Sequence, residues 1–387
     1  MIARAIAPEF HRLLGEYPVV TILGPRQAGK TTLARHELPD VPYSNLENPE
    51  VRAFATGDPK AYLAQFPGRV IIDEIQRVPA LLSYIQAMVD DERRHGRFVL
   101  TGSHQPQVRA AVSQSLAGRV ALLHLLPLSI RELRDAGTTL PSFADYAYRG
   151  FLPRIYDRKL RPSACYSNYL QTYVERDVRQ LVQLKDASLF EKFIKLLAGR
   201  CGQILEVSSL ASDTGVDAKT VRNWLAVLEA SFVIFKLPSY HENFGKRVIK
   251  APKYYFTEVG LLSFVLGLRE PAQVARDPLV GQIFENLVVI ECLKARYNRG
   301  EMPDLHFFRD SNRQEVDLVS PVGGGLLAAE IKSSSTFHPS LLAGLRRFRD
   351  LAGRKKCRPV LIYNGQPFTT SDGTAALNFA HCASLFD

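Results

Sequence analysis

The stretch Gly24-Pro-Arg-Gln-Ala-Gly29-Lys30-Thr31-Thr32 decides the fold of this chain. An apolar, β-branched run from Val19 to Leu23 precedes it and predicts a buried strand, while the residues after it predict the first turn of a helix. The two glycines let the backbone curl so that its N–H groups point at a phosphate, and the helix adds its positive N-terminal end. The stretch therefore predicts a strand, a phosphate-binding loop and a helix.

Every residue of this loop is a candidate contact to a nucleotide. The expected cofactor-binding residues are Gly24, Pro25, Arg26, Gln27, Ala28, Gly29, Lys30, Thr31 and Thr32. We expect Lys30 to act catalytically by reaching the β- and γ-phosphates of ATP, and the Thr31 hydroxyl to bind Mg²⁺. The alternative is an ordinary glycine turn, and the flanking strand and helix favour the phosphate loop.

A second strand ends in two carboxylates, in the run Gly68-Arg-Val-Ile-Ile-Asp73-Glu74. Buried parallel strands bind ligands at their carboxyl ends, so both side chains are expected beside the loop. We expect Asp73 to hold Mg²⁺ through water and Glu74 to orient and polarise the attacking water. An acidic pair at a strand end is also common as a simple turn. Its position 43 residues after Lys30 (73 − 30) favours the catalytic interpretation.

Two further stretches offer groups that can sense a phosphate. The strand ending in Leu100-Thr101-Gly102-Ser103 presents hydroxyls at its carboxyl end, although Thr101 can equally cap the helix that follows. Arg119 begins another predicted strand and is a candidate arginine for a nucleotide phosphate, in its own chain or in a neighbouring copy. An arginine paired at the sheet edge fits the spacing equally well, and Arg109 is a weaker candidate.

A helix-turn-helix is predicted further along. The helix over residues 209–214 ends at Gly215, and Asp217 caps a second helix. Its outward residues are candidates for contact with DNA: Lys219, Thr220, Arg222 and Asn223. A basic ribbon extends this surface with Lys246, Arg247, Lys250 and Lys253. Winged helices also dock proteins, and a basic ribbon can be a solvated face, so both alternatives stay open.

The last third of the chain holds a second group of polar residues. Glu285 lies on a predicted helix, Asp317 on a strand, and Glu330-Ile-Lys332 on the next strand, where alternation puts Glu330 and Lys332 on one face. A hairpin can bring Asp317 beside them. Carboxylates that hold Mg²⁺ and a lysine that positions water are what metal-assisted phosphodiester cleavage requires.

Together these motifs resemble the AAA-superfamily ATPases of bacteria and archaea that carry a fused C-terminal restriction-endonuclease-like domain. The resemblance covers almost the whole chain and rests on the loop, on Asp73-Glu74-Ile-Gln76, on Leu100-Thr-Gly-Ser103, on Gly118-Arg119 with Pro127-Leu-Ser-x-x-Glu132, and on Lys250-Ala-Pro-Lys253-Tyr-Tyr-Phe256. The sequence departs from this family at Thr257-Glu258-Val259, where we expect an Asp before Gly260-Leu261. The last group of polar residues is similar to the PD-(D/E)XK nuclease core. It implies the metal ligands Glu285, Asp317 and Glu330 and the catalytic residues Asp317, Glu330 and Lys332.

The resemblance implies an α/β fold of four parts. A P-loop AAA-type ATPase core is expected over residues 1–135, a helical lid over 136–200, a winged helix-turn-helix over 201–240 and a nuclease-like α/β domain over 241–387. Nuclease-like folds also serve as binding modules, so cleavage is a separate question from fold.

Composition bounds the partners and the compartment. A formal net charge of +10 is compatible with polyanionic partners without specifying one. The five cysteines form no Cys-x-x-Cys pair, which favours a reducing cytoplasm over disulfides or zinc. No run approaches the roughly 18 apolar residues of a membrane span, so no membrane partner is expected.

We therefore expect an ATPase that uses ATP and Mg²⁺ and couples its nucleotide state to DNA through the winged helix and the nuclease-like domain. The alternative is a nucleotide-dependent signalling switch whose C-terminal domain binds a protein and lacks nuclease activity. If Arg119 acts on a neighbouring copy, a homo-oligomer is required.

Overall fold

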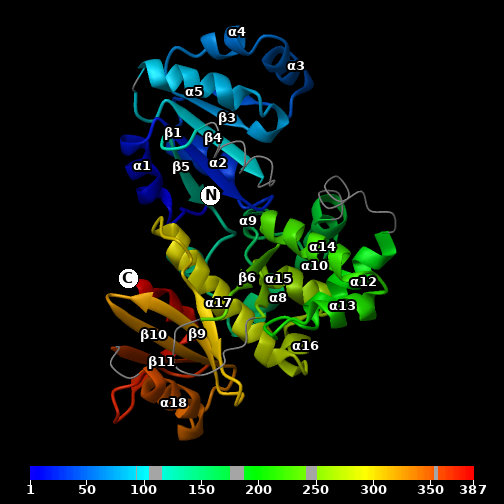
Figure 1. Ribbon diagram of the computed structural model, residues 1–387, viewed down its shortest axis with the longest axis vertical. Helices are drawn as coiled ribbons and strands as arrows, with labels where there is room; N and C mark the ends of the chain where they lie inside the picture. Colours follow the sequence, from blue (N-terminus) through cyan, green and yellow to red (C-terminus); the bar gives the residue numbers. More distant parts are fainter. Residues whose placement is uncertain (93, 104–115, 175–186, 241–250, 353–355) are drawn as a thin grey trace.

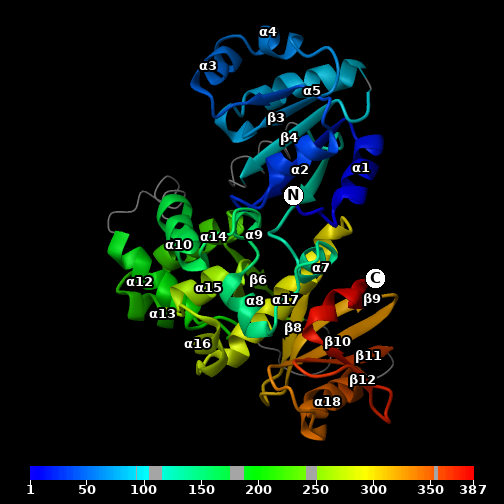
Figure 2. The ribbon, with the colours of Figure 1, turned by 180° about the vertical axis from the view of Figure 1, so that it is seen from behind.

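The computed structural model of the chain describes residues 1–92, 94–103, 116–174, 187–240, 251–352 and 356–387. The described residues form an N-terminal α/β domain, a helical domain and a C-terminal mixed sheet (Figures 1 and 2). The N-terminus lies on the side of the α/β domain that faces the helical domain and the C-terminal sheet.

The N-terminal domain is built on a parallel sheet with the strand order β2-β3-β4-β1-β5. Its strands are β1 Val19–Gly24, β2 Tyr43–Asn45, β3 Val70–Asp73, β4 Phe98–Ser103 and β5 Val120–His124. Gly24 pairs with Ser103, and Asn45 pairs with Asp73. The register therefore brings the glycine loop and the acidic pair to the carboxyl edge of one sheet, which confirms the predicted α/β domain.

Helices cover both faces of this sheet because alternate strand residues point to opposite sides. Val20, Ile22 and Val99 pack with α1 (Ala7–Glu16) and α2 (Lys30–Glu37). The opposite face packs against α3 (Pro49–Gly57), α4 (Pro59–Ala64) and α5 (Leu81–Glu92). A short 3₁₀ turn, η1 (Ile75–Arg77), follows the acidic pair.

The helical domain follows the α/β domain. Its elements are α7 Ile130–Asp135, α8 Phe143–Arg149, α9 Pro153–Asp157, α10 Pro162–Tyr169, the π-helix η2 Leu170–Val174, α12 Ala187–Ala198, α13 Val207–Thr214, α14 Ala218–Ala230, α15 Val259–Val265 and α16 Pro271–Arg276. Strands β6 (Ile234–Leu237) and β7 (Lys253–Phe256) form an antiparallel pair beside them.

The expected domain boundary at residue 241 is wrong. Strand β7 pairs with β6, and both α15 and α16 pack on α8, so residues 251–276 belong with the helical domain. The physical reason is burial: the four residues of β7 are all buried, and this strand finds its only described ladder partner in β6.

The C-terminal sheet has the order β12-β13-β11-β10-β9-β8. Its elements are β8 His306–Arg309, β9 Glu315–Val322, β10 Gly325–Lys332, the 3₁₀ turn η3 Pro339–Leu342, α18 Ala343–Ala352, β11 Cys357–Tyr363, β12 Phe368–Thr369, β13 Ala375–Asn378 and the 3₁₀ helix η4 Phe379–Phe386. Strands β9 and β10 form a hairpin, whereas β10 and β11 are parallel. Helix α18 packs on one face of this sheet.

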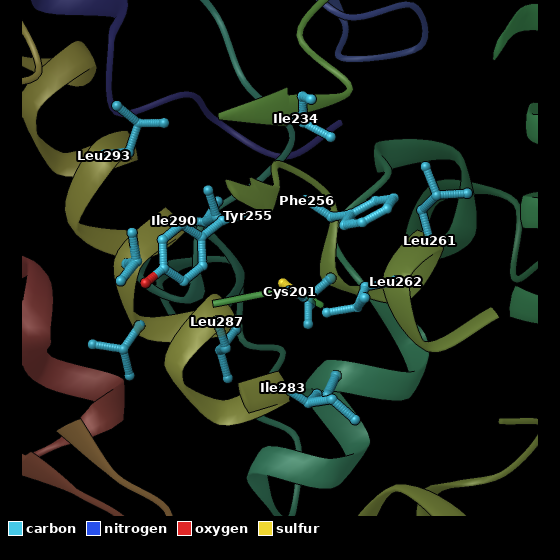
Figure 3. Packing of buried hydrophobic residues seen from close by; sticks show 14 of the residues in the cluster. Cys201, Ile234, Tyr255, Phe256, Leu261, Leu262, Ile283, Leu287, Ile290 and Leu293 are labelled. Atoms are coloured by element: carbon cyan, nitrogen blue, oxygen red, sulfur yellow. The ribbon is translucent and has the colours of Figure 1, made fainter. Parts of the chain in front are cut away.

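Helix α17 (Val280–Asn298) lies between the other parts of the molecule (Figure 1). It contacts β5 of the first domain, β7, α8, α15 and α16 of the helical domain, and β10 and η4 of the C-terminal part. Figure 3 shows Ile283, Leu287 and Ile290 of α17 packed near Tyr255 of β7 and Leu262 of α15. A helix that is apolar on most of its circumference is one that is buried on most sides, and α17 fits this description.

Candidate active site

The glycines of the loop are required by geometry. Gly24 has φ 157°, and a Cβ at this position would lie 2.0 Å from the carbonyl oxygen of Leu125, so a larger residue does not fit. Gly29 has φ 95° and precedes α2 as its N-cap. These two positions allow the chain to turn from β1 into α2, as the spacing predicts.

Lys30 is buried inside the loop that it terminates. Its Nζ donates hydrogen bonds to the carbonyl oxygens of Gly24 (3.0 Å) and Pro25 (2.8 Å). The ammonium group is thus held at the centre of the loop, where a phosphate bound by the loop N–H groups would lie. A phosphate that engages Lys30 competes with these two carbonyl oxygens for its protons.

Asp73, the last residue of β3, accepts hydrogen bonds from residues of three other elements, α2, β2 and β4. Its Oδ1 accepts a hydrogen bond from Thr31 Oγ1 at 2.9 Å, and its Oδ2 accepts one from Tyr43 at 2.8 Å. Thr101 also donates to Oδ1. The loop threonine and the strand carboxylate, separated by 42 residues, are therefore neighbours, as expected of a pair that shares Mg²⁺. Sequence reasoning missed Tyr43, because nothing in its surroundings marks a tyrosine as the partner of a distant carboxylate.

Glu74 has an unusual backbone conformation, with φ 60°. Non-glycine residues with positive φ are uncommon and mark turns or strained sites. Here the conformation directs the chain from β3 into η1, and the Gln76 side chain donates to Glu74 Oε2. Burial raises the pKa of Glu74, Lys30 opposes this rise, and Asp73 adds to it.

A cavity of about 430 Å³ opens between the loop and the helical domain. It is lined by Met1, Ile2, Arg4, Arg26, Gln27, Gly29, Lys30, Thr31, Thr32, Glu74, Leu128, Pro153, Arg154, Asp157 and Arg158. The Gln27 side-chain oxygen is buried there without a hydrogen-bond partner, which suits a site that receives a polar ligand. The sequence did not reveal Arg154 and Arg158, exposed residues at α9 that bring positive charge to this cavity.

One of the expected phosphate contacts, Thr101, is corrected by the structure. Thr101 is fully buried, and its hydroxyl donates to Asp73 and accepts from the Glu74 N–H at 3.3 Å, so it supports the acidic pair. It does not line the cavity, and the helix that it was expected to cap lies outside the described residues. Ser103 ends β4, and Arg109 lies outside the described residues.

Arg119 does not reach the nucleotide cavity of its own chain. It precedes β5, whose first residue Val120 pairs with Val19 at the amino edge of the sheet, opposite the loop. Its guanidinium binds Asp90 of α5, with 3.0 Å between Nη2 and Oδ2. The predicted contact of Arg119 with a nucleotide phosphate in its own chain is therefore wrong, because ligand sites of parallel sheets lie at the carboxyl edge. A role toward a neighbouring copy stays a prediction.

The C-terminal residues Asp317, Glu330 and Lys332 lie together. Lys332 Nζ is 3.1 Å from Asp317 Oδ2 and 2.6 Å from Glu330 Oε1. Burial and the nearby Asp317 carboxylate raise the pKa of Glu330 to about 7, although Lys332 opposes this rise. The hairpin of β9 and β10 thus brings these three side chains to one place, as the alternation predicts.

Glu285 is held by a different lysine. Lys253 Nζ lies 2.9 Å from Glu285 and 2.7 Å from Glu315, and Tyr255 donates to Glu285 at 2.6 Å. Lys253 is buried, so it does not join a basic ribbon on the surface; Lys246, Arg247 and Lys250 lie outside the described residues. Nothing in the short sequence stretch around Lys253 distinguishes a buried lysine from a surface one.

The expected metal set of Glu285, Asp317 and Glu330 stays a prediction. Across the described residues, no group of three or more His, Cys, Asp or Glu side chains is arranged to hold a metal ion. Lys253 and Lys332 each donate to oxygens of these carboxylates, while Glu330 Oε2 is buried without a hydrogen-bond partner.

Helices α13 and α14 lie where the helix-turn-helix is predicted, and the motif itself stays a prediction. Gly215 follows α13 with φ 90°, and Asp217 caps α14 by accepting from the Thr220 N–H at 2.8 Å. Lys219, Arg222 and Asn223 are exposed. The Thr220 hydroxyl differs from these three side chains, because it donates its hydrogen bond to Asp217 at 2.7 Å and cannot donate the same proton to DNA.

Comparison with known proteins places this site in a class. Residues 16–134 match the family model described as "AAA domain", and the loop, Asp73 and Glu74 all lie within this range. The chain therefore carries an AAA-type, ATP-binding ATPase domain. Two further models, each described as a domain of unknown function, match residues 140–272 (DUF8612) and 280–381 (DUF4143).

The chain belongs to the family of "Uncharacterized protein Rv2008c" of Mycobacterium tuberculosis and "Uncharacterized protein Mb2031c" of Mycobacterium bovis. Each is 34% identical to it over 381 residues, which cover 97% of this chain and 83% of the relative. Among solved structures it is similar to the Walker-type ATPase PABY2304 of Pyrococcus abyssi. The two are 14% identical, with a TM-score of 0.46, over 68% of this chain and 96% of that one. In the described part of the chain, no helix has both the length and the apolar character needed to cross a membrane.

Proposed function

We propose that this protein is a Mg²⁺-dependent ATPase whose nucleotide state controls its interaction with DNA. The observation that carries the ATPase half is the direct contact of Thr31 with Asp73 beside a cavity into which Glu74 and Lys30 open. These are the groups that phosphoryl transfer requires: Lys30 and Thr31 begin α2, Asp73 ends β3, and Glu74 follows it.

The residues present fit a magnesium ion bound with ATP. Thr31 Oγ1 and Asp73 Oδ1, 2.9 Å apart, are hard oxygen ligands of the kind that Mg²⁺ prefers, directly or through water. When bound, the ion neutralises charge on the β- and γ-phosphates. Tyr43 and Thr101 also donate to the Asp73 carboxylate and hold it in place.

Glu74 is the residue that we propose orients the attacking water. It lines the cavity, and the hydrogen bond from Gln76 fixes one of its two carboxylate oxygens. Lys30 binds the γ-phosphate in place of the loop carbonyls, while Arg154 and Arg158 supply further positive charge from the helical domain. A nucleotide in this cavity therefore contacts both domains, and its loss changes how they are held together.

The DNA half of the proposal rests on α14. Lys219, Arg222 and Asn223 are exposed and separated by three and four positions, so they lie on one face of this capped helix. The net charge of +10 favours association with a polyanion. The order of elements, a short helix, α14 and the β6-β7 strand pair, supports the proposal that α14 is a recognition helix.

Reversing charge on α14 tests this half. We expect Lys219→Glu with Arg222→Glu to weaken binding to duplex DNA at least about tenfold at low salt, and to lower the salt dependence of binding. The matched control reverses two exposed basic residues elsewhere, Lys60→Glu with Arg276→Glu. Fluorescence anisotropy measures binding, and ATPase rates with and without DNA measure coupling. Equal DNA affinity in both double variants and the wild type would show that α14 does not carry the DNA contact. Wild-type protein that binds no DNA would support the signalling switch instead.

For the C-terminal part we propose a binding module without nuclease activity. Its carboxylates are neutralised by Lys253 and Lys332 and hold β7, β9, β10 and α17 together. We expect supercoiled plasmid to stay intact in the presence of Mg²⁺ and ATP, as judged by gel electrophoresis. Nicking by the wild type that disappears in the Asp317→Ala, Lys332→Ala double variant would show that this module is a nuclease.

A further inference from the structure

We propose that Arg4 is a positioning residue that couples the nucleotide loop to helix α17 through residues 126–132. Nucleotide binding and the state of the C-terminal half then affect each other through one buried polar network. This inference rests on ATP binding at the loop and adds the route by which that binding reaches the rest of the chain.

Arg4 belongs to no recognised nucleotide motif, yet it holds the loop directly. Its Nη1 donates to the carbonyl oxygen of Ala28 at 2.7 Å, and its Nη2 donates to that of Leu126 at 2.6 Å. Its Nε binds Glu132 Oε1 at 2.9 Å. One guanidinium thus joins the nucleotide loop to the segment that leaves the α/β domain.

Glu132 continues the network into the start of α7. Its carboxylate accepts the N–H of Ala5 at 2.8 Å and the N–H of Ser129 at 2.7 Å, and the latter contact is part of the capping box of α7. A shift of Arg4 therefore moves a group on which the N-terminus of α7 depends.

Helix α17 is hydrogen-bonded to the same segment, residues 126–132. Glu291 Oε2 accepts the Ile130 N–H at 2.8 Å, and Lys294 Nζ donates to the carbonyl oxygen of Leu128 at 2.7 Å. Glu291 and Lys294 also pair with each other at 2.7 Å. The residues from Leu126 to Glu132 are thus hydrogen-bonded to Arg4 at one side and to α17 at the other.

All four charged groups of this network are buried. Arg4 is 8% exposed, Glu132 3%, and Glu291 and Lys294 2% each. Two cations balance two carboxylates, so the network is stable only when every member keeps its partner. Leaving a buried charged group without its partner costs free energy. A shift of Arg4 or of α17 should therefore move the hydrogen-bonded partners with it, because otherwise a buried group would be left unpaired.

Nucleotide binding should disturb this network at the nucleotide loop. Lys30 binds the carbonyl oxygens of Gly24 and Pro25, and a phosphate that takes up Lys30 releases them. Arg4 holds Ala28 in the same loop. Nucleotide binding therefore acts on Arg4 from one side, and rearrangements of α17 act on it from the other, which is the requirement for reciprocal coupling.

The test measures ATP affinity in variants at both ends of the network, with a fluorescent ATP analogue as the probe. We expect Glu291→Gln, which touches neither the loop nor the cavity lining, to change the Kd by at least about fivefold. Arg4→Gln should change it as well, Arg4→Lys should partly restore it, and the effects of Arg4→Gln and Glu291→Gln should not multiply. Asn286→Ala is the control, since Asn286 is a buried hydrogen-bonding residue of α17 outside the network.

Wild-type affinity in folded Glu291→Gln, or effects of the two variants that simply multiply, would overturn the coupling while leaving the ATPase assignment intact. Wild-type protein that fails to bind the probe would overturn both. Hydrogen exchange on the wild type keeps the proposal testable if a variant does not fold. ATP should change the exchange of the amide of Ile130 and of the residues of α17 near Glu291, and unchanged exchange there contradicts the coupling.

Discussion

Replacing Glu74 by glutamine is expected to lower ATP turnover by about 10²–10⁴-fold while leaving ATP affinity nearly unchanged. The amide keeps the size of the side chain and the contact with Gln76, but it cannot accept the proton of an attacking water. Lys30, Thr31 and the loop backbone, which hold the phosphates, are untouched by this change. Phosphate release measures turnover, and equilibrium binding of a fluorescent ATP analogue measures affinity.

A matched control for this variant is Glu47→Gln. Glu47 is a nearby exposed glutamate whose carboxylate binds Arg77 at 2.6 Å, and it does not line the cavity. We expect wild-type turnover for it. Wild-type turnover in Glu74→Gln would assign the water-orienting role elsewhere, whereas a joint loss of turnover and affinity would show that Glu74 is needed to keep the site folded.

Replacing Lys253 by methionine is expected to destabilise the protein by about 3–5 kcal/mol. Lys253 is 2% exposed and neutralises both Glu285 and Glu315. Burial alone would lower its pKa, but these carboxylates and Asp317 together raise it, so the lysine is charged in the folded state. Methionine fills a similar volume and leaves Glu285 without its cation, while Glu315 keeps Arg309 at 3.2 Å. Urea unfolding followed by circular dichroism measures the loss.

The loss in Lys253→Met should also depend on pH. Burial raises the pKa of Glu285, and Lys253 is the main group that opposes this. Without the lysine, folded Glu285 binds a proton at a higher pH than the unfolded chain does, so stability is lost as pH rises between the two pKa values. The deficit should be smaller near roughly pH 5 than near pH 8. Lys236→Met is the control, because Lys236 is exposed on the neighbouring strand β6; an equal loss there would refute the explanation.

The parts of this molecule that sequence reasoning predicted are those with local signatures. Glycine spacing, an apolar strand and a following helix identified the nucleotide loop, and the acidic pair at a strand end led to the contact of Thr31 with Asp73. Alternation along β10 placed Glu330 and Lys332 on one face. In each case a short pattern carries the physical requirement by itself.

The contacts that were missed join residues far apart in the chain. Tyr43 meets Asp73 across 30 positions, and Arg4 meets Leu126 across 122. An isolated arginine or tyrosine has no local pattern that names its partner. Arg119 was misplaced for a different reason: a residue that begins a strand of a parallel sheet lies at the edge opposite the ligand, and strand direction alone could have excluded it.

Helix α17 has a consequence for how the chain folds. It supplies apolar side chains to the helical domain and to the C-terminal sheet at once. One matched model ends at residue 272, and the next begins at residue 280, the first residue of α17. Two regions that share one buried helix cannot unfold separately without exposing that helix to water. The helical domain and the C-terminal sheet should therefore unfold together as one cooperative unit, although the matched models divide them in the sequence.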